Sequence, residues 1–325
     1  MRALVTDRFS EAGLACLRAG GLEVLNRSGI TGAELVEAIR GVQALLVRSQ
    51  TRVDEALLTE AEGLLVIGRA GVGYENIDIA ACDRRGIAVM NTPGASAITT
   101  AERTIALMLA LLHQIPIADR SVRAGRWDRR SFMATELFGK TLGVLGYGNI
   151  GRVVAERARG LHMRVLTHDP VVAREAAFNI GAEPVGFDDL LSGADIVTCH
   201  VSADPGLAGL IGRREFSLMK PGAWFVNTSR GFLVDEAALV DALTDGSLAG
   251  AALDVFATEP LPADSRLRSF DNVILSPHLG ASTREAEARV SMSAAEQVVR
   301  FLHTGVLVNA VSRPPFLRHA PRATN

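Results

Sequence analysis

Short apolar runs alternate with amphipathic stretches along the first part of the chain. The runs have the length of buried strands, and the stretches between them show the apolar spacing of helices. Such alternation is typical of a parallel sheet with helices on both faces. The predicted strands are 3–5, 23–25, 44–47, 64–67 and 88–90, and the predicted helices are 11–19, 32–40, 54–61 and 76–84.

A second series of strand-like runs begins near residue 141. Two complete α/β series predict an α/β protein with two doubly wound parallel-sheet domains and a cleft between them. We expect the first sheet to be flavodoxin-like and the second to be a dinucleotide-binding sheet, for the reason given below. The strands predicted for the second sheet are 141–145, 165–167, 196–200, 223–227, 250–255 and 273–275.

Two long helical patterns, 99–118 and 283–302, flank the second series. We interpret both as helices that cross between the lobes, so that the C-terminal segment completes the first domain. The proline-containing tail from Arg313 is expected to be poorly ordered. The predicted domains are residues 1–97 with 284–325, and residues 98–283.

The second series opens on a glycine-spaced turn directly after its first strand. In this turn Gly146 permits the tight bend, Gly148 lets the backbone approach a pyrophosphate, and Gly151 lets the next helix pack on the strand. The N-terminus of that helix offers free N–H groups to the phosphates. The pattern indicates a Rossmann domain. The complete turn is Gly146-Tyr147-Gly148-Asn149-Ile150-Gly151.

Asp169 follows the second strand of this series, where a carboxylate binds ribose hydroxyls. The same carboxylate would repel a 2′-phosphate, and Pro170 and Val171 come next rather than arginines. The expected cofactor is therefore NAD rather than NADP. An aspartate that only caps a helix is the alternative interpretation.

Composition excludes several classes of function. The net charge is −2 and there is no polybasic segment, so neither nucleic acid nor a membrane surface is an expected partner. The longest apolar stretch, 105–112, is too short to span a bilayer. The N-terminus has the pattern of a strand rather than of a signal peptide. Cys16, Cys82 and Cys199 are far apart, which favours a cytoplasmic protein without disulfides and without a metal site.

Polar side chains follow the last three predicted strands. Arg230, Glu259 and His278 each come shortly after a different strand, and the carboxyl ends of parallel strands meet at one edge of a sheet. A guanidinium binds a carboxylate, and an imidazole transfers protons near neutral pH. A carboxylate behind the imidazole fixes its tautomer. Together the three suit oxidation of an alcohol next to a carboxylate, although each alone has an ordinary structural interpretation.

Further candidates are less specific. Asp254 lies within the predicted strand 250–255, where a buried acid needs a partner, and we expect it to reach the nicotinamide amide. His200, at the end of a strand, is expected to touch the cofactor. In the first domain, residues 68–73 predict either an anion-binding nest or a simple turn. Arg48 and Arg69 would add positive charge there. Arg129 belongs to a basic cluster that is either a phosphate contact or a solvated face.

With these residues the chain resembles the NAD-dependent D-2-hydroxyacid dehydrogenases, from about Leu45 to Ala310. Phe132-Met133-Ala134-Thr135-Glu136-Leu137 is similar to the phosphoglycerate branch of that family. The other segments that carry the resemblance are Val47-Arg48-Ser49, Gly68-Arg69-Ala70-Gly71-Val72-Gly73, Asn91-Thr92-Pro93, Ala101-Glu102, the glycine turn, Ser229-Arg230-Gly231, Gly250-Ala251-Ala252-Leu253-Asp254-Val255-Phe256 and Pro277-His278-Leu279-Gly280-Ala281.

The resemblance implies a small 2-hydroxyacid or 2-ketoacid substrate and a homodimer built on the cofactor domains. It implies that Arg230 binds substrate, that His278 is the acid–base and that Glu259 is its partner. It also implies substrate contacts from the Val72 and Gly73 backbone, with Arg48, Arg69 and Arg129 near a phosphate. The implied cofactor contacts are Gly146, Gly148, Asn149, Ile150, Gly151, Asp169, His200, Val201, Thr228, Ser229, Arg230, Asp254, His278, Gly280 and Ala281.

Some features depart from the family pattern. Val201-Ser202 stands where a proline is common in the second position, and Leu207-Ala208 replaces a usual threonine. The regulatory domain of longer relatives has no counterpart in this sequence, so feedback by serine through it is not expected. Two alternatives stay open: the same chemistry on hydroxypyruvate, glyoxylate or another 2-ketoacid, and an NAD-sensing protein like the corepressors that share this fold.

Overall fold

The structure is a computed structural model that describes residues 1–172 and 174–312. The chain divides into two compact units. The first unit is Met1–Ser96 with Ala281–Asn325, and the second unit is Ala97–Gly280. The predicted domain boundaries were 97/98 and 283/284. The predicted disorder of the tail from Arg313 falls outside the described residues.

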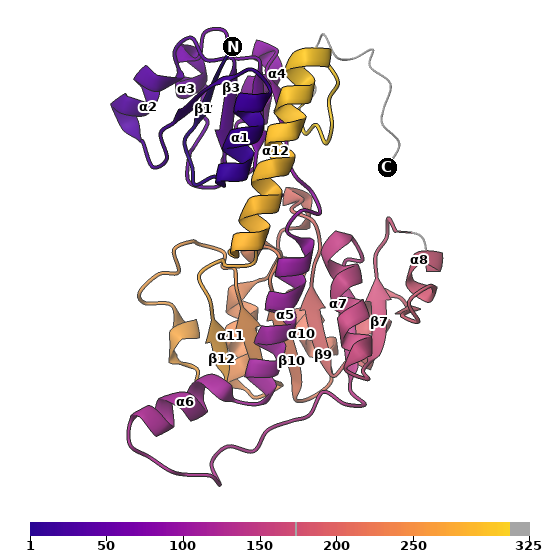
Figure 1. The fold of residues 1–325 in the computed structure, drawn as a ribbon. Helices are drawn as coiled ribbons and strands as arrows, with labels where there is room; N and C mark the ends of the chain where they lie inside the picture. Colours follow the sequence, from indigo (N-terminus) through magenta and orange to yellow (C-terminus); the bar gives the residue numbers. More distant parts are fainter. Residues whose placement is uncertain (173, 313–325) are drawn as a thin grey trace. The chain divides into compact units, whose positions relative to one another are not determined.

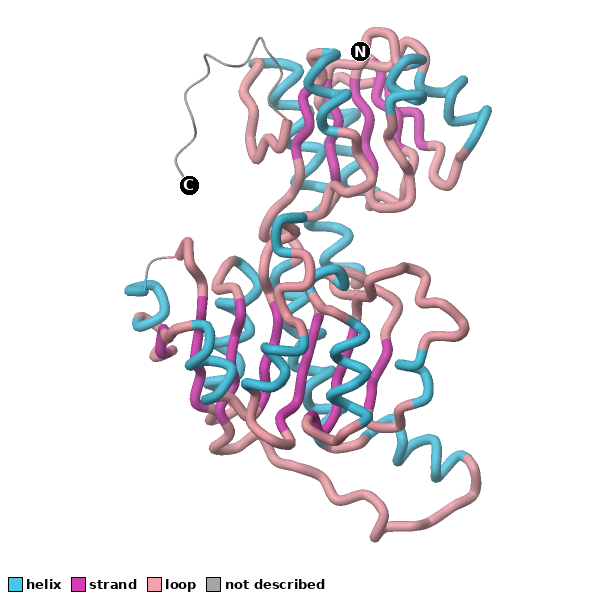
Figure 2. Tube along the Cα trace, turned by 180° about the vertical axis from the view of Figure 1, so that it is seen from behind, coloured by secondary structure: helices cyan, strands magenta, loops and turns pink. Residues whose placement is uncertain are grey.

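The first unit is built on a five-stranded parallel sheet of order β2-β1-β3-β4-β5. This is the flavodoxin-like order that the sequence predicts. Helices cover both faces of the sheet (Figure 2). The strands are β1 (Arg2–Val5), β2 (Glu23–Asn26), β3 (Ala44–Val47), β4 (Val66–Arg69) and β5 (Ala88–Met90), and the helices are α1 (Glu11–Ala19), α2 (Gly32–Ile39), α3 (Glu55–Glu60), α4 (Ile79–Arg85) and α12 (Arg284–Thr304).

The C-terminal helix α12 completes the core of the first unit. It packs along α1 and over β4 (Figure 1). Val290, Ala294 and Val298 of α12 are buried in one cluster with Leu14 and Leu17 of α1. Burial of this apolar face holds the last described helix on a sheet formed by the first ninety residues.

Two elements of the first unit begin two or three residues later than predicted. Strand β4 begins at Val66 rather than at residue 64, and the side chain of Leu65 just before it is 46% exposed. Helix α4 begins at Ile79 rather than at residue 76. Asp78 is its N-cap and accepts a hydrogen bond from the Ala81 N–H, which sets the start of the helix.

The second unit is built on a seven-stranded parallel sheet of order β12-β11-β10-β9-β6-β7-β8. The order reverses between β6 and β9, and ligands bind at such a switch point in open α/β sheets. The predicted class of two doubly wound sheets is confirmed. The strands are β6 (Thr141–Leu145), β7 (Arg164–His168), β8 (Glu183–Pro184), β9 (Ile196–Cys199), β10 (Ala223–Asn227), β11 (Leu248–Leu253) and β12 (Val273–Leu275).

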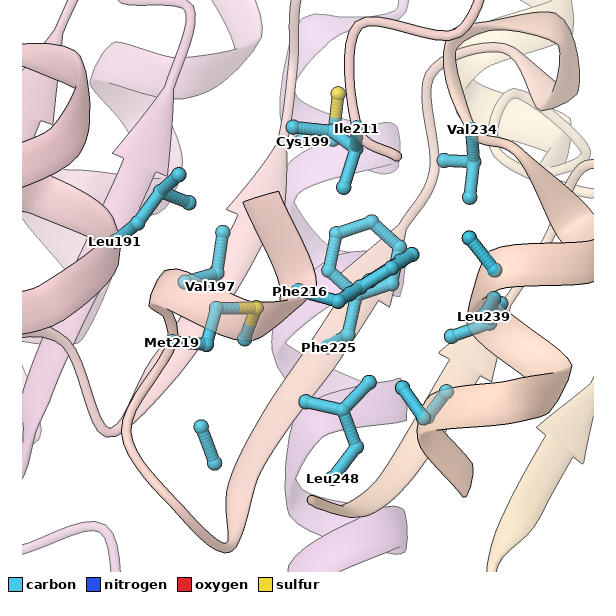
Figure 3. Packing of buried hydrophobic residues seen from close by; sticks show 14 of the residues in the cluster. Leu191, Val197, Cys199, Ile211, Phe216, Met219, Phe225, Val234, Leu239 and Leu248 are labelled. Carbon is cyan, nitrogen blue, oxygen red and sulfur yellow. The ribbon is translucent and has the colours of Figure 1, made fainter. Parts of the chain in front are cut away.

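Helices cover both faces of this sheet as well (Figure 2). On one face, the Phe216 ring meets Phe225 of β10 edge-on, with ring centroids 5.4 Å apart (Figure 3). Met108 of α5 and Val154 of α7 are buried in the cluster on the other face. The helices are α5 (Ala97–Leu112), α6 (Ile115–Arg123), α7 (Asn149–Gly160), α8 (Arg174–Phe178), α9 (Phe187–Gly193), α10 (Arg213–Leu218) and α11 (Glu236–Thr244), with 3₁₀ turns at Pro205–Leu207, Gly231–Leu233 and Arg266–Ser269.

The single helix predicted over 99–118 is wrong, because the structure breaks it into α5 and α6 with a 61° bend. Pro116 is the cause. A proline there has no N–H for the Leu112 carbonyl and would clash with it in a continuous helix. Gln114 makes the break with a left-handed φ of 55°. No single helix among the described residues is long and apolar enough to cross a membrane, and α5 with α6 meets that test only as a bent pair.

Candidate active site

Three neighbouring strands of the second unit deliver the predicted catalytic side chains. Strands β10, β11 and β12 lie next to one another, and Arg230, Glu259 and His278 follow their respective carboxyl ends. His278 Nδ1 lies 2.7 Å from Glu259 Oε2. The positive charge of Arg230 also acts on the Glu259 carboxylate. The structure therefore brings the three groups together at one edge of the sheet.

A close backbone approach places Arg230 beside Glu259. A Cβ on Gly231 would lie 1.9 Å from the carbonyl carbon of Phe256, so only glycine lets the loop after β10 rest on the loop after β11. Asn227 shapes the first loop, since its Nδ2 donates to the Arg230 carbonyl at 2.9 Å and its Oδ1 accepts from the Ser229 N–H at 3.0 Å. Asn227 was not among the predicted site residues, and its only signal in the sequence is its place at a strand end.

His278 has an unusual backbone. Its φ is 54°, in the left-handed region that non-glycine residues rarely adopt, and such residues cluster at functional sites. Its side chain is 48% exposed. With Nδ1–H donated to the Glu259 carboxylate, the neutral ring presents the lone pair of Nε2 outward. That nitrogen is placed to accept a proton.

Glu259 is held as a carboxylate. Burial acts to raise the pKa of the Glu259 carboxyl, but the hydrogen bonds from His278 and the Phe256 N–H, with the charges of His278 and Arg230, hold that pKa below its ordinary value. The Phe256 N–H donates to Oε1 at 3.1 Å, while Oε2 faces His278. Each oxygen thus has its own partner, and the carboxylate stabilises a protonated imidazole.

The glycine turn has the geometry of a phosphate cradle. A Cβ on Gly146 would lie 2.6 Å from the backbone of His200, and one on Gly151 would lie 2.0 Å from the Gly146 carbonyl oxygen. The turn is therefore packed tightly against β9 and under α7. A Cβ on Gly148, by contrast, would meet nothing within 4 Å. This open side, at the N-terminus of the 12-residue helix α7, fits the pyrophosphate of a dinucleotide.

Asp169 serves the turn and still has capacity for a ligand. Its Oδ2 accepts from the Tyr147 N–H at 2.7 Å, and its Oδ1 accepts from the Val171 and Val172 N–H groups at 2.8 and 2.9 Å. Burial acts to raise the pKa of the Asp169 carboxyl, but these three bonds hold it below its ordinary value. An ionised carboxylate offers about four acceptor sites, so roughly one is left for a ribose hydroxyl. Capping and ribose binding are compatible here.

We expect Asp169→Asn to shift cofactor preference toward NADP. The substitution keeps the shape but removes the charge that repels a 2′-phosphate, so the NAD to NADP ratio of kcat/KM should fall by about tenfold or more, or ~1.4 kcal/mol. Steady-state kinetics with both cofactors measures this ratio. Asp264→Asn, at an exposed acid elsewhere in the second unit, is the matched control. An unchanged ratio would show that Asp169 acts only as a cap.

Three further predicted cofactor residues, Thr228, Ser229 and Asp254, follow the carboxyl ends of β10 and β11. Thr228 Oγ1 bonds Thr104 Oγ1 at 2.8 Å, and Ser229 Oγ donates to the Val201 carbonyl at 2.5 Å. Asp254 follows β11 directly instead of lying within it, which corrects the predicted strand 250–255. Its side chain is fully buried, and its Oδ2 has no hydrogen-bond partner among the described residues. An orphaned acceptor at this edge fits a carboxamide N–H of the predicted cofactor.

The His200 side chain is buried, so its predicted contact with the cofactor gains no support from its position. Nε2 lies 3.0 Å from Thr198 Oγ1, and burial lowers the pKa of His200 from its ordinary value to about 3. The unfolded chain binds a proton below about pH 6.5, whereas the folded protein stays neutral at this ring. Stability is therefore fully present above pH 6.5 and is lost as pH falls below it.

We expect His200→Gln to reduce the fall in unfolding free energy that occurs as the pH is lowered. Between about pH 8 and pH 5, the wild type should lose roughly 2 kcal/mol of unfolding free energy through this one group, and the variant should not. Urea unfolding at the two pH values measures the difference. Parallel losses in both proteins would show that the ring is not protonated selectively in the unfolded chain.

The first unit holds the other predicted substrate residues. The Arg48 guanidinium lies 3.7 Å from Glu287, and Arg69 Nη1 donates to the Ala70 carbonyl at 3.2 Å. The Val72 carbonyl accepts from Asn91 Nδ2 at 2.6 Å. The N–H groups of Val72 and Gly73 donate to no other group within the described part of the chain. These free donors suit an anion, and the substrate role of all four residues stays a prediction.

Arg129 lies apart from the catalytic side chains of its own sheet. It belongs to the segment that connects α6 to the beginning of β6, at the amino ends of the strands (Figure 1). Arg230 and His278 follow the carboxyl ends. The exposed Arg129 therefore does not join them within one chain.

A cavity of about 380 Å³ lies at this amino-end edge. Lys140 and Lys220, the two lysines of the sequence, both line it, together with Asp195 and Trp224. Lys220 Nζ lies 2.8 Å from Asp195 Oδ1. Because ligands of open α/β sheets bind beyond the carboxyl ends, this cavity is not the candidate active site.

Comparison with known proteins gives a consistent result. The family model described as D-isomer specific 2-hydroxyacid dehydrogenase, NAD binding domain, matches residues 105–280, almost the whole second unit. The chain is 47% identical over 314 residues to D-3-phosphoglycerate dehydrogenase of Archaeoglobus fulgidus. That match covers 97% of this chain and 60% of the archaeal protein, so the chain spans about three fifths of that relative's length.

Solved structures are similar over nearly the full chain. A glyoxylate reductase from Paecilomyes thermophila has a TM-score of 0.84 at 30% identity, with coverage of 96% of this chain and 98% of the other. A 3-phosphoglycerate dehydrogenase from Entamoeba histolytica, solved with bound NAD⁺, has a TM-score of 0.82 at 26% identity, with coverage of 97% and 99%. These comparisons support the NAD-binding assignment of the second unit.

Proposed function

Because the chain belongs to the D-isomer specific 2-hydroxyacid dehydrogenase family, we propose that it transfers a hydride between C2 of a D-2-hydroxyacid and NAD. The observation that carries this proposal is the His278–Glu259 pair beside Arg230, at the carboxyl edge of a sheet whose glycine turn fits a pyrophosphate. A protein that only senses NAD is the candidate from another class, and it would bind the cofactor without hydroxyacid turnover.

The chemistry follows from the groups present. NAD supplies the hydride acceptor when it is bound. Arg230 binds the substrate carboxylate and stabilises negative charge that develops on the C2 oxygen. Nε2 of His278 accepts the hydroxyl proton, and Glu259 stabilises the imidazolium that results. In the reverse direction, His278 returns that proton to the carbonyl oxygen.

We further propose that D-3-phosphoglycerate is the preferred hydroxyacid. The identity of 47% to an archaeal D-3-phosphoglycerate dehydrogenase supports this substrate, as does the resemblance of the segment Phe132–Leu137 to the phosphoglycerate branch. The similarity to a glyoxylate reductase keeps a plain 2-ketoacid as the second candidate. A spectrophotometric assay of NADH formation with a panel of D- and L-2-hydroxyacids, phosphorylated and not, tests both.

We expect the arginines to discriminate between these candidates. Replacing Arg48, Arg69 or Arg129 with Gln should lower kcat/KM for D-3-phosphoglycerate by about 10-fold to 100-fold, the size of a lost charge-assisted hydrogen bond. The same substitutions should change kcat/KM for D-glycerate less than threefold or so. Arg126→Gln, in the same exposed segment, is the control. Equal losses on both substrates would contradict a phosphate contact.

We also propose a homodimer through the second unit. Exposed apolar side chains gather between α6 and β6: Trp127 is 80%, Met133 82% and Phe138 70% exposed. Apolar groups in such number mark an association surface. A substrate contact by Arg129 would then have to come from a second copy of the chain. Light scattering of the purified protein, at concentrations that span the expected dissociation, tests the dimer.

A further inference from the structure

Arg103, whose side chain is 31% exposed, and the buried Asp254 form an ion pair that the proposed mechanism leaves unexplained. Arg103 lies on α5, and Asp254 follows β11 with its side chain completely buried. Arg103 Nε lies 3.7 Å from Asp254 Oδ1. Removing one member of a buried ion pair leaves the other uncompensated, so the arginine determines whether a charged Asp254 is tolerated.

Ser276 joins the two residues. Its hydroxyl accepts from Arg103 Nη2 and donates to Asp254 Oδ1. The Leu279 N–H donates to the same oxygen at 3.0 Å. Oδ1 therefore has a hydroxyl, an N–H and a guanidinium around it, and the plane of the carboxylate is fixed.

The second carboxylate oxygen of Asp254 has no hydrogen-bond partner in the described part of the chain. Oδ2 of Asp254 is buried and accepts no hydrogen bond from the described residues, and Arg103 Nε is likewise buried without one. A buried carboxylate oxygen without a donor is costly and needs an explanation. Asp254 lies beside the acid–base residue, because its main-chain carbonyl accepts from the His278 N–H at 2.8 Å. The missing donor is therefore expected where hydride transfer takes place.

We propose that Arg103 is a positioning residue that acts through Asp254 on the nicotinamide end of the cofactor. Directly and through Ser276, it turns Oδ2 toward the cofactor and compensates the charge of Asp254. The pair thereby sets the relative affinity of the protein for oxidised and reduced cofactor. This inference rests on the proposed function, because it takes the nicotinamide to lie next to His278.

The charge of the ring makes the inference specific. NAD⁺ and NADH share the adenosine and pyrophosphate, but the oxidised nicotinamide carries a positive charge and the reduced ring is neutral. An uncompensated carboxylate nearby stabilises only the positive ring. Substitutions that merely loosen the site weaken the binding of NAD⁺ and of NADH alike. The ratio of the two dissociation constants therefore isolates the electrostatic effect.

The test measures the Kd of NADH by fluorescence and the Kd of NAD⁺ by calorimetry, without substrate and at one alkaline pH. In Arg103→Met, we expect the ratio of the Kd of NADH to that of NAD⁺ to rise about tenfold, or ~1.4 kcal/mol. Asp254→Asn should move the ratio in the opposite direction. Arg103→Lys, which restores the charge, should return it to the wild-type value.

Ser276→Ala is the matched control, since it breaks the hydrogen-bonded link between Arg103 and Asp254 and keeps both charges. Both dissociation constants should rise, while the ratio of the Kd of NADH to that of NAD⁺ should stay within about twofold of the wild-type value. A ratio unchanged in Arg103→Met, or equal shifts in Arg103→Met and Asp254→Asn, would overturn the proposal. If Arg103→Met does not fold, the ratio of the two dissociation constants is compared between Arg103→Lys and Asp254→Asn. The proposal expects the wild-type ratio in Arg103→Lys and a lower ratio in Asp254→Asn. Hydroxyacid turnover is assayed in parallel, so that a protein with the expected ratios but no turnover contradicts the proposed function alone.

Discussion

Replacing His278 with asparagine is expected to lower kcat by about a hundredfold to ten thousandfold, the usual size of a lost acid–base group. Its Nε2 accepts the proton that leaves the C2 hydroxyl, and no amide replaces that basicity. Asparagine is the better substitution because it tolerates the left-handed backbone at this position, whereas alanine would add strain. NADH binding should change little. Stopped-flow measurement of hydride transfer and a fluorescence titration separate the two effects.

His162 provides a matched control for this experiment. It is also a histidine of the second unit with a left-handed φ, 59°, and it packs against Phe138 rather than against a carboxylate. His162→Asn should keep kcat within about twofold. Glu259→Gln should lower kcat less than His278→Asn, and the double variant should be no slower than His278→Asn alone, because the carboxylate acts through the imidazole. Near-normal turnover in His278→Asn would end the acid–base assignment.

Arg230→Gln is expected to lower kcat/KM for the hydroxyacid by about a thousandfold or more, or ~4 kcal/mol. The guanidinium binds the carboxylate in the ground state and stabilises charge on the C2 oxygen in the transition state, so KM should rise and kcat should fall together. The Kd of NADH should change far less than KM for the hydroxyacid, since the glycine turn is untouched. Initial rates over a wide range of substrate, with a parallel cofactor titration, measure these quantities.

Arg230→Lys distinguishes charge from geometry. Lysine keeps the charge but loses the planar pair of donors, so we expect it to recover only part of the loss. Arg213→Lys, at an exposed arginine paired with Asp241 in the same unit, controls for the substitution itself. Full recovery by lysine would mean that Arg230 acts as a simple counter-charge, and an effect on KM alone would remove it from the chemical step.

Local patterns predicted most of the strands, and they singled out three candidate catalytic residues whose roles stay a prediction. Fully buried strands such as β3 and β6 are short apolar runs, and a run of that kind is visible without knowledge of its neighbours. The glycine turn and the strand-end positions of Arg230 and His278 follow from chain order alone. The order of the strands then places those ends next to each other.

Contacts between residues far apart in the chain could not be predicted from the sequence. Nothing local in α5 shows that Arg103 meets Asp254 and Ser276, which lie more than a hundred residues later, since such contacts depend on how elements pack. Gly231 looked like part of a motif, while its physical role is the close approach to Phe256. The break before α6 was predictable, because Pro116 stands inside the pattern that was interpreted as one helix.

The cavity at the amino-end edge has a practical consequence for handling this protein. The two lysines of the sequence, Lys140 and Lys220, both line that cavity, while the loops that carry Arg230 and His278 contain no lysine. Amine-directed coupling chemistry would thus attach the second unit to a support or a dye by the side opposite its reactive groups. Coupling through Lys140 or Lys220 would leave the carboxyl-end edge of that sheet facing away from the support.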